Sequence, residues 1–203
     1  TPPEVKLLLQ DIMKGVEKKD VFIGCSGNFT TDKIMSNMGY TVHSNDVSLY
    51  SKLISDLLLD TNTDIEVVNP ELRLVFDTWK DTRYKNLVHV MFAMRVSGFH
   101  QRKNDYQEEM FNSFIEQADI YYHNTISKLE KGALNFNISS FFYGDFFDFL
   151  KSKKGKGIGI AFPPTYKGGY EKMFSYVEDS FRYAHAPYNV FDPKEGGVMF
   201  KCL

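Results

Sequence analysis

The most constraining feature of the sequence is the stretch VFIGCSGNFTTDKIMSNMGYTVHSNDVSLY at residues 21–50. A short apolar run leads into the turn GCSG at residues 24–27, where small side chains let the backbone approach a ligand closely. A helix capped by Thr30 or Thr31 is expected next, and a second strand at residues 40–44. This order predicts a βαβ unit of a parallel α/β sheet.

An acidic residue follows the second strand. Asp46 comes after Gly27 at close to the spacing of about 20 residues at which a carboxylate meets ribose hydroxyls in a βαβ nucleotide site. The turn reads G-x-x-G rather than G-x-G-x-x-G, which favours a single adenosine such as S-adenosylmethionine over a dinucleotide. A tight strand-to-helix turn without a ligand is the alternative interpretation.

Composition sets limits on partners and environment. The 203 residues suffice for one α/β domain with a sizeable core. A formal net charge of −2 excludes a basic coat, so contact with nucleic acid must come from local patches. Cys25 and Cys202 cannot build a disulfide framework or a zinc site, which favours a reducing cytoplasm.

No segment is long and apolar enough to span a membrane, and the N-terminus lacks the features of a signal peptide. The chain stops in a strand-like run at residues 199–203. We therefore expect a fragment or a processed piece of a longer protein, with a missing C-terminal region or a protein partner as its complement.

The remaining pattern predicts one α/β domain over residues 1–203. An N-terminal helix extends to about Val16 and packs one apolar face on the sheet, and a polar-aromatic helical pattern indicates a helical insertion at about 70–135. Further helices are expected at 48–59, 146–150 and 171–183, and further strands at 136–142 and 157–162.

The second informative motif is Pro163-Pro164-Thr165-Tyr166, which directly follows the last apolar strand. Two prolines stiffen a loop at the carboxyl end of a strand, where open α/β sheets bind their ligands. Together with the glycine turn, this motif resembles the S-adenosylmethionine-dependent DNA adenine-N6 methyltransferases, and in detail the antirestriction adenine methyltransferases of phages and mobile elements. The similarity covers most of residues 21–170 outside the helical insertion.

The resemblance implies a Rossmann-like class I methyltransferase core with a mostly parallel sheet. In that family the glycine turn holds the methionine part of the cofactor, the acid after the second strand binds the ribose, and a G-D-F segment contacts the adenine. The implied cofactor residues are Gly24, Ser26 and Gly27 for the methionine part, Asn45 and Asp46 for the ribose, and Gly144, Asp145 and Phe146 for the adenine. Taken alone, Asp145 is typical of a helix cap rather than a ligand, and its position between a strand and the catalytic loop makes the two interpretations equal.

The family's D-P-P-Y catalytic loop maps onto Phe162, Pro163, Pro164 and Thr165, with Tyr166 one place further on. An exocyclic adenine amine is a poor nucleophile, because its lone pair is delocalised into the ring, and the family's Asp accepts its hydrogen bonds. A phenylalanine side chain cannot accept them. Backbone carbonyls of this loop and the threonine hydroxyl remain as acceptors, and the two aromatic rings are available to stack on a flipped base.

The implied substrate is double-stranded DNA with a flipped adenine, in the cytoplasm of a bacterial host cell. Arg95, Arg102 and Lys103 form a basic patch in the insertion, and Lys153 and Lys154 belong to a second one. A solvated helix end is the alternative for the second patch. The histidines lie in separate segments without carboxylates at ligand spacing, which predicts no metal site.

Two other functions stay open. A methyltransferase-like module without activity would bind cofactor or DNA and act through a partner. A Rossmann enzyme with another nucleotide is disfavoured by the Pro-Pro loop.

Overall fold

The computed structural model describes residues 3–17, 19–162 and 170–188. The chain divides into two compact units. The first contains the described residues up to Thr61, those from Phe136 to Phe162 and those from His185 onward, and the second contains residues 62–135 and the described part of 168–184.

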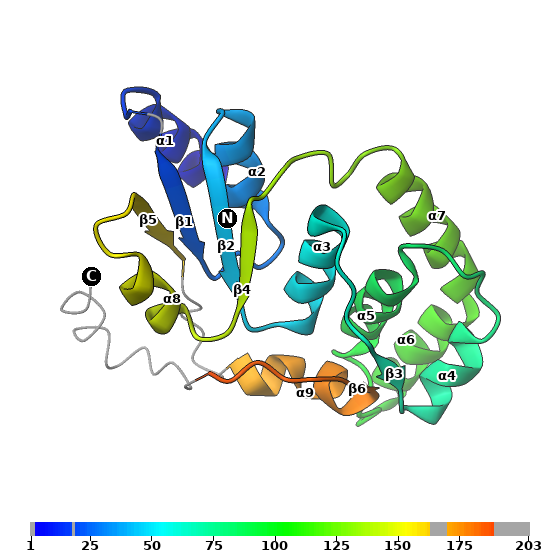
Figure 1. The fold of residues 1–203 in the computed structure, drawn as a ribbon. Helices are drawn as coiled ribbons and strands as arrows, with labels where there is room; N and C mark the ends of the chain where they lie inside the picture. The colour runs from blue at the N-terminus through cyan, green and yellow to red at the C-terminus, as the bar shows by residue number, and fades with distance from the viewer. Residues whose placement is uncertain (1–2, 18, 163–169, 189–203) are drawn as a thin grey trace. The chain divides into compact units, whose positions relative to one another are not determined.

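The first unit is built on a parallel sheet of four strands (Figure 1). Along the chain they are β1 (Asp20–Gly24), β2 (Thr41–Asp46), β4 (Ser140–Tyr143) and β5 (Ile158–Ala161), and in the sheet they run β4-β2-β1-β5. This is the spatial order 3-2-1-4 of a doubly wound sheet, whose switch point lies between β1 and β5. The predicted α/β, Rossmann-like fold is confirmed.

Strand alternation separates the two faces of the sheet. Phe22 of β1 stacks on His43 of β2 with ring centroids 4.9 Å apart, and it meets Phe149 of α8 (Phe146–Lys153) edge-on. On the opposite face, Ser44 of β2 bonds to Asp32 of α2 (Thr30–Asn37). An aromatic cluster therefore lies under α8, whereas on the α2 face Ser44 and Asp32 adjoin the buried Val21, Ile23 and Val42.

Two helix predictions need correction. In α1 (Pro3–Lys14), Leu8 and Ile12 are 61% and 59% exposed, because the helix is held on its other side, where the Tyr40 hydroxyl donates to the Met13 carbonyl. Neither Thr30 nor Thr31 caps α2. Its N-cap is Phe29 in a left-handed conformation, since the Asn28 side chain takes up both the N–H and the hydroxyl of Thr30.

Other boundaries follow the prediction more closely. The helix α3 (Leu49–Leu59) is capped by Ser48, whose hydroxyl accepts from the Ser51 N–H. The strand β4 begins at Ser140 rather than at 136, because only the last residues of the predicted strand pair with β2.

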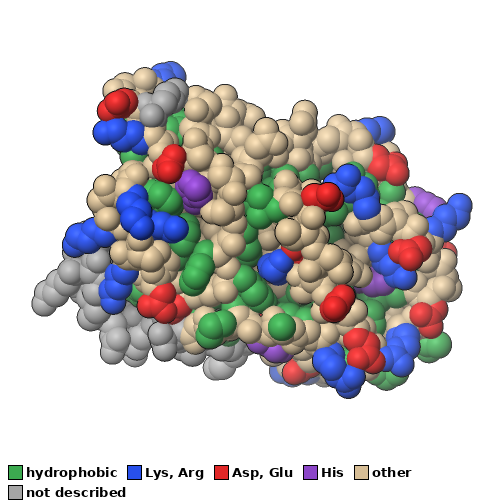
Figure 2. All heavy atoms as spheres, in the orientation of Figure 1, with side chains coloured by type: hydrophobic (Ala, Val, Ile, Leu, Met, Phe, Trp, Pro, Cys, Tyr) green, Lys and Arg blue, Asp and Glu red, His purple; other side chains and the backbone are tan. Residues whose placement is uncertain are grey.

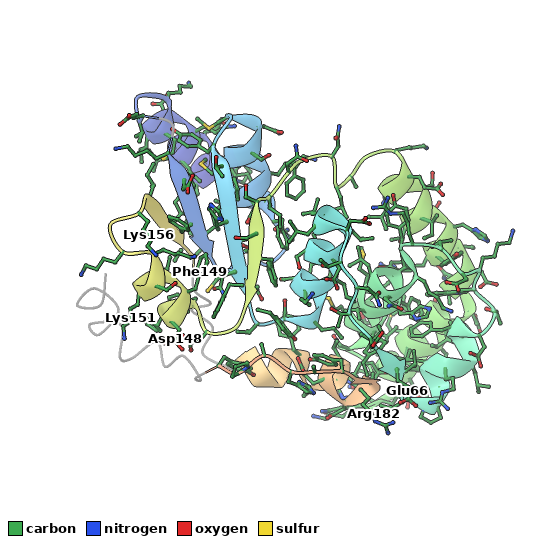
Figure 3. The ribbon with its side chains drawn as sticks, in the orientation of Figure 1. Glu66, Asp148, Phe149, Lys151, Lys156 and Arg182 are labelled. Atoms are coloured by element: carbon green, nitrogen blue, oxygen red, sulfur yellow. The ribbon has the colours of Figure 1, made fainter. Side chains whose placement is uncertain are left out.

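The second unit is mainly helical, as predicted for residues 70–135. Its helices are α4 (Pro70–Phe76), α5 (Lys85–Val96), α6 (Asp105–Glu116), α7 (Ala118–Glu130) and α9 (Tyr170–Ser180). A short antiparallel pair, β3 (Glu66–Val67) with β6 (Phe181–Arg182), was not predicted, and it ends the last helix earlier than expected. Figure 3 shows Glu66 and Arg182 side by side, with 2.6 Å between Oε2 and Nη1.

Aromatic side chains fill the interior of the second unit. The His89 ring lies flat on Phe76 with centroids 4.1 Å apart, and Trp79 stacks on Tyr122. Burial, assisted by Lys85, lowers the pKa of His89 to about 4, so this histidine is a neutral core residue at physiological pH.

None of the described helices is long and apolar enough to cross a membrane. Within the described ranges, no three His, Cys, Asp or Glu side chains are grouped so as to hold a metal ion.

Candidate functional site

The carboxyl ends of the four strands bring together the segments singled out in the sequence. Gly24 at the end of β1 pairs with Ala161 of β5, and Asp46 at the end of β2 pairs with Tyr143 of β4. A side chain at position 24 would stand 3.5 Å from Ala161 and from Phe146. Residues from three distant segments thus meet around the glycine turn.

The turn at residues 24–27 has an unusual backbone. Cys25, Gly27 and Phe29 all have positive φ, at 59°, 55° and 58°. A left-handed conformation costs a residue with a side chain roughly 1–2 kcal/mol. A Cβ at Gly27 would meet no atom within 4 Å, so the space beside this peptide is open to a ligand.

The Asp46 carboxylate contacts the glycine turn. The N–H of Gly27 donates to Asp46 Oδ2 at 2.8 Å, while the N–H groups of Val47 and Ser48 donate to Oδ1 at 2.9 and 2.8 Å. A carboxylate has about four acceptor positions. One position on Oδ2 therefore remains for a ligand hydroxyl beside Gly27.

Asn45 braces the site. Its buried side-chain amide donates to the carbonyls of Phe142 and Gly144 at 2.9 and 2.7 Å, and its backbone carbonyl accepts from the Ser26 N–H at 2.9 Å. The side chain thereby ties the end of β4 to β2. It points along the sheet toward β4.

Asp145 is a helix cap as well as a member of the site. Its Oδ1 accepts from the Phe147 N–H at 2.8 Å at the start of α8. Burial, Asp46 and Asp145 all raise the pKa of the Cys25 thiol. The two carboxylates therefore flank the same turn, and Cys25 stays protonated.

The sequence analysis missed Asp32. This side chain is fully buried, and its Oδ1 accepts from the hydroxyls of Ser26 at 2.9 Å and Ser44 at 2.5 Å. Burial raises its pKa to about 6, although both hydrogen bonds oppose the rise. The available signal was an acid in the first turn of a helix that follows a glycine turn.

The predicted catalytic loop begins at the end of β5. Phe162 is 41% exposed there, and its neighbour Ala161 contacts the turn through Gly24. Pro163, Pro164, Thr165 and Tyr166 lie outside the described residues.

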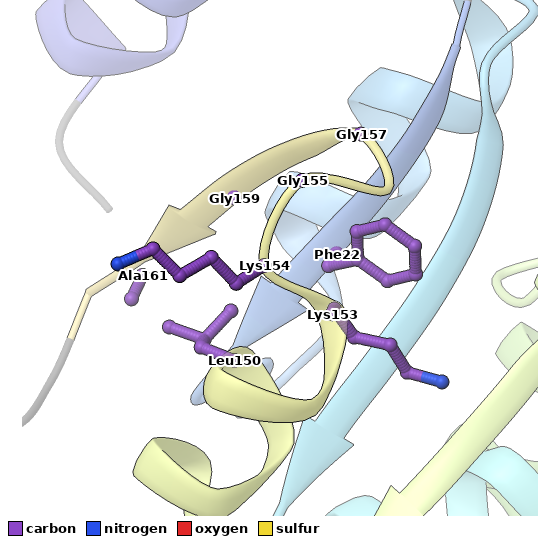
Figure 4. A pocket seen from close by; sticks show the side chains of 8 residues that line it. All are labelled: Phe22, Leu150, Lys153, Lys154, Gly155, Gly157, Gly159 and Ala161. Carbon is purple, nitrogen blue, oxygen red and sulfur yellow. The ribbon is translucent and has the colours of Figure 1, made fainter. Parts of the chain in front are cut away.

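The basic residues near α8 border a groove of about 270 Å³ along β5 (Figure 4). The strand lines it with Gly159 and Ala161, the preceding turn adds Gly155 and Gly157, and Lys153 and Lys154 stand on the α8 side. The Lys153 ammonium lies 5.7 Å from the centre of the Phe22 ring. Figure 2 shows Lys and Arg side chains gathered over this end of the unit.

The basic patch of the second unit is different. The Arg102 Nη2 lies 2.6 Å from both carboxylate oxygens of Glu71, and its guanidinium covers Phe111. Arg95 lies over Phe114, 4.5 Å from the ring centre, while Lys103 is exposed. The two arginines thus already have partners within the unit.

Comparison with known proteins places the chain in a family. A model described as Phage DNA Adenine Methylase-like domain 1 matches residues 1–203. The chain belongs to this family. No curated protein and no solved structure matched it. Membership confirms the resemblance to phage adenine methyltransferases, and DNA adenine methylation is the activity that the family indicates.

Proposed function

We propose that this protein transfers a methyl group from S-adenosylmethionine to adenine N6 in DNA, and that residues 1–203 act as one methyltransferase-like domain. The observation that carries the proposal is the charge at the strand ends. Asp46 and Asp145 both raise the pKa of the Cys25 thiol, and Asp46 also raises the pKa of Asp32. No positively charged residue type balances these carboxylates at the strand ends, because Lys, Arg and His are all absent from residues 24–27, 45–48, 144–146 and 161–162.

This charge favours one class of nucleotide over another. A cofactor with a diphosphate would place its negative charge beside carboxylates. The start of α2, the usual place for phosphate, is already occupied by Asp32, and the Gly27 N–H is bound to Asp46. A cationic sulfonium with a free amino group suits the same surroundings, which argues against the alternative nucleotide enzyme.

The residues present fit such a cofactor. The open space beside Gly27 would admit the methionine part next to Gly24 and Ser26. The free acceptor position of Asp46, braced by Asn45, would take a ribose hydroxyl. The adenine would lie toward Gly144, Asp145 and Phe146.

When bound, S-adenosylmethionine would supply an electrophilic methyl group for adenine N6: the S–C bond would break as the N–C bond forms, and the proton lost by the amine would pass to water. The protein would have to hold the adenine amine in line with that methyl group. With Phe162 in place of an acidic residue, the acceptors for the amine hydrogens would be the loop carbonyls and the Thr165 hydroxyl. Phe162 and Tyr166 would stack on the flipped base.

DNA would be held by backbone contacts from exposed cations. Lys153 and Lys154 beside the β5 groove and the exposed Lys103 would make these contacts, since Arg102 is paired with Glu71 and Arg95 covers Phe114. The biological role would be protection of phage or mobile-element DNA from restriction in the bacterial cytoplasm.

One observation favours a second function. Phe162 offers no acceptor through its side chain, so the chain could bind cofactor and DNA without turnover and act through a partner protein. Both functions require cofactor binding, and only the first transfers a methyl group.

The deciding experiment has two parts. Calorimetry with S-adenosylhomocysteine measures binding, and tritium transfer from labelled cofactor to unmethylated DNA measures catalysis, with nucleoside mass spectrometry to identify N6-methyladenine. The enzyme should transfer label, and Tyr166→Ala should reduce transfer about ten- to hundredfold by loss of base stacking, and Phe162→Ala less. Binding without transfer would leave the non-catalytic module, and no binding would refute both.

A further inference from the structure

A role in stability alone does not explain why a carboxyl group is fully buried at Asp32. This residue lies in the first turn of α2, the helix beside β2 in Figure 1. Its Oδ1 accepts from the hydroxyls of Ser26 and Ser44, and its Oδ2 has no hydrogen-bond partner among the described residues. Removing a charged group from water without satisfying all its acceptors is unfavourable. A neutral polar side chain could bind the same two hydroxyls at lower cost.

The residue that Asp32 holds lies in the strained turn. Ser26 stands between Cys25 and Gly27, both with positive φ. Its N–H is bound to the Asn45 carbonyl and its hydroxyl to Asp32, so the turn is fixed to β2 on one side and to α2 on the other. The Ser26 hydroxyl is thereby directed into the protein rather than toward a ligand.

We propose that Asp32 is a positioning residue of the cofactor site, which acts through Ser26 to hold the turn that receives the methionine part. This inference rests on the proposed function. Asp32 does not touch the ligand, because its side chain is fully buried. Its carboxylate accepts hydrogen bonds that are stronger than those a neutral amide would accept.

The ionisation of Asp32 gives the proposal a specific signature. Burial, with a smaller contribution from Asp46 on β2, raises its pKa to about 6, while Cys25 in the turn keeps its proton. His43, also on β2, faces α8 and pairs with Asp20. If the ionised form holds the turn, cofactor affinity must weaken as the pH falls through 6.

The test compares four proteins by calorimetry with S-adenosylhomocysteine, together with their melting temperatures. These are the wild type, Asp32→Asn, Ser26→Ala and the control Asp56→Asn. Asp56 is a matched control, because it is also buried, binds Lys52 and Thr61, and has an oxygen without a partner among the described residues, yet lies on α3.

We expect Asp32→Asn and Ser26→Ala each to lower affinity about tenfold or more at pH 7.5, while Asp56→Asn retains it. Between pH 7.5 and 5 the affinity of the wild type should fall, and that of Asp32→Asn should change less, since an amide at position 32 does not titrate in this range.

Four results would overturn the inference. Wild-type affinity in both turn variants would show that the network does not position the cofactor, and an equal loss in Asp56→Asn would indicate a general effect of stability. Parallel pH profiles would exclude the role of the charge. Absence of binding by the wild type would refute the proposed function itself, and this inference with it.

Discussion

Replacing Asp32 by Asn should change how the stability of this protein depends on pH. Burial raises the pKa of the carboxyl from its ordinary value of 3.8 to about 6, so the folded chain binds this proton more tightly than the unfolded chain does. The contribution of the group is fully present below pH 3.8 and is lost as the pH rises through 6. At 1.36 kcal/mol per unit of pKa, the complete loss is about 3 kcal/mol.

Asn does not titrate, so the Asp32→Asn variant lacks this pH-dependent contribution to the free energy of unfolding. The free energy of unfolding, measured by urea denaturation at several pH values, should diverge between the two proteins. From pH 4.5 to 7.5 the wild type should lose about 2 kcal/mol relative to Asp32→Asn. Because the comparison runs across pH, a constant cost of burying the amide cancels.

The result that would refute this reasoning is a parallel pH dependence. It would mean that Asp32 titrates alike in the folded and unfolded chains, and hence that it is neither buried nor enclosed as the structure has it. A divergence of the opposite sign would mean that the hydrogen bonds of Ser26 and Ser44 outweigh desolvation.

Three further predictions concern the site and its surroundings. Asp46→Ala should weaken S-adenosylhomocysteine binding by about 1–3 kcal/mol in calorimetry, because a ribose hydroxyl loses a charged acceptor and the turn loses its anchor; unchanged affinity would contradict the assignment. Replacing Lys153 and Lys154 by Ala should lower the slope of log affinity for DNA against log salt by about 2; an unchanged slope would move the DNA surface elsewhere. In a Cys202→Ser background, Cys25 should react slowly with maleimide at pH 8, since burial and two carboxylates raise its pKa, and fast alkylation would contradict the enclosed turn.

Local pattern was enough to predict the βαβ unit. An apolar run, a glycine turn and an acid at nucleotide-site spacing each depend on neighbours in the chain, and the contact between Gly27 and Asp46 follows from them. The second motif placed the end of β5 beside Gly24 for the same reason, because carboxyl ends of parallel strands meet at one edge.

Long-range packing decided what the sequence could not. Phe29 is the N-cap of α2, because the Asn28 side chain accepts hydrogen bonds from both the N–H and the hydroxyl of Thr30. The strand β6 exists because it pairs with β3. Both depend on partners whose positions no local pattern fixes.

The sequence by itself determined the βαβ unit, the position of the glycine turn and the acid at nucleotide-site spacing, since these depend on periodicity and spacing. Only the tertiary structure decided that Asn45 braces β4 and that Asp32 is buried against Ser26 and Ser44. Burial and the partners of a polar side chain arise from several segments at once, and a carboxylate in the first turn of a helix reads the same in the sequence whether it faces water or the core.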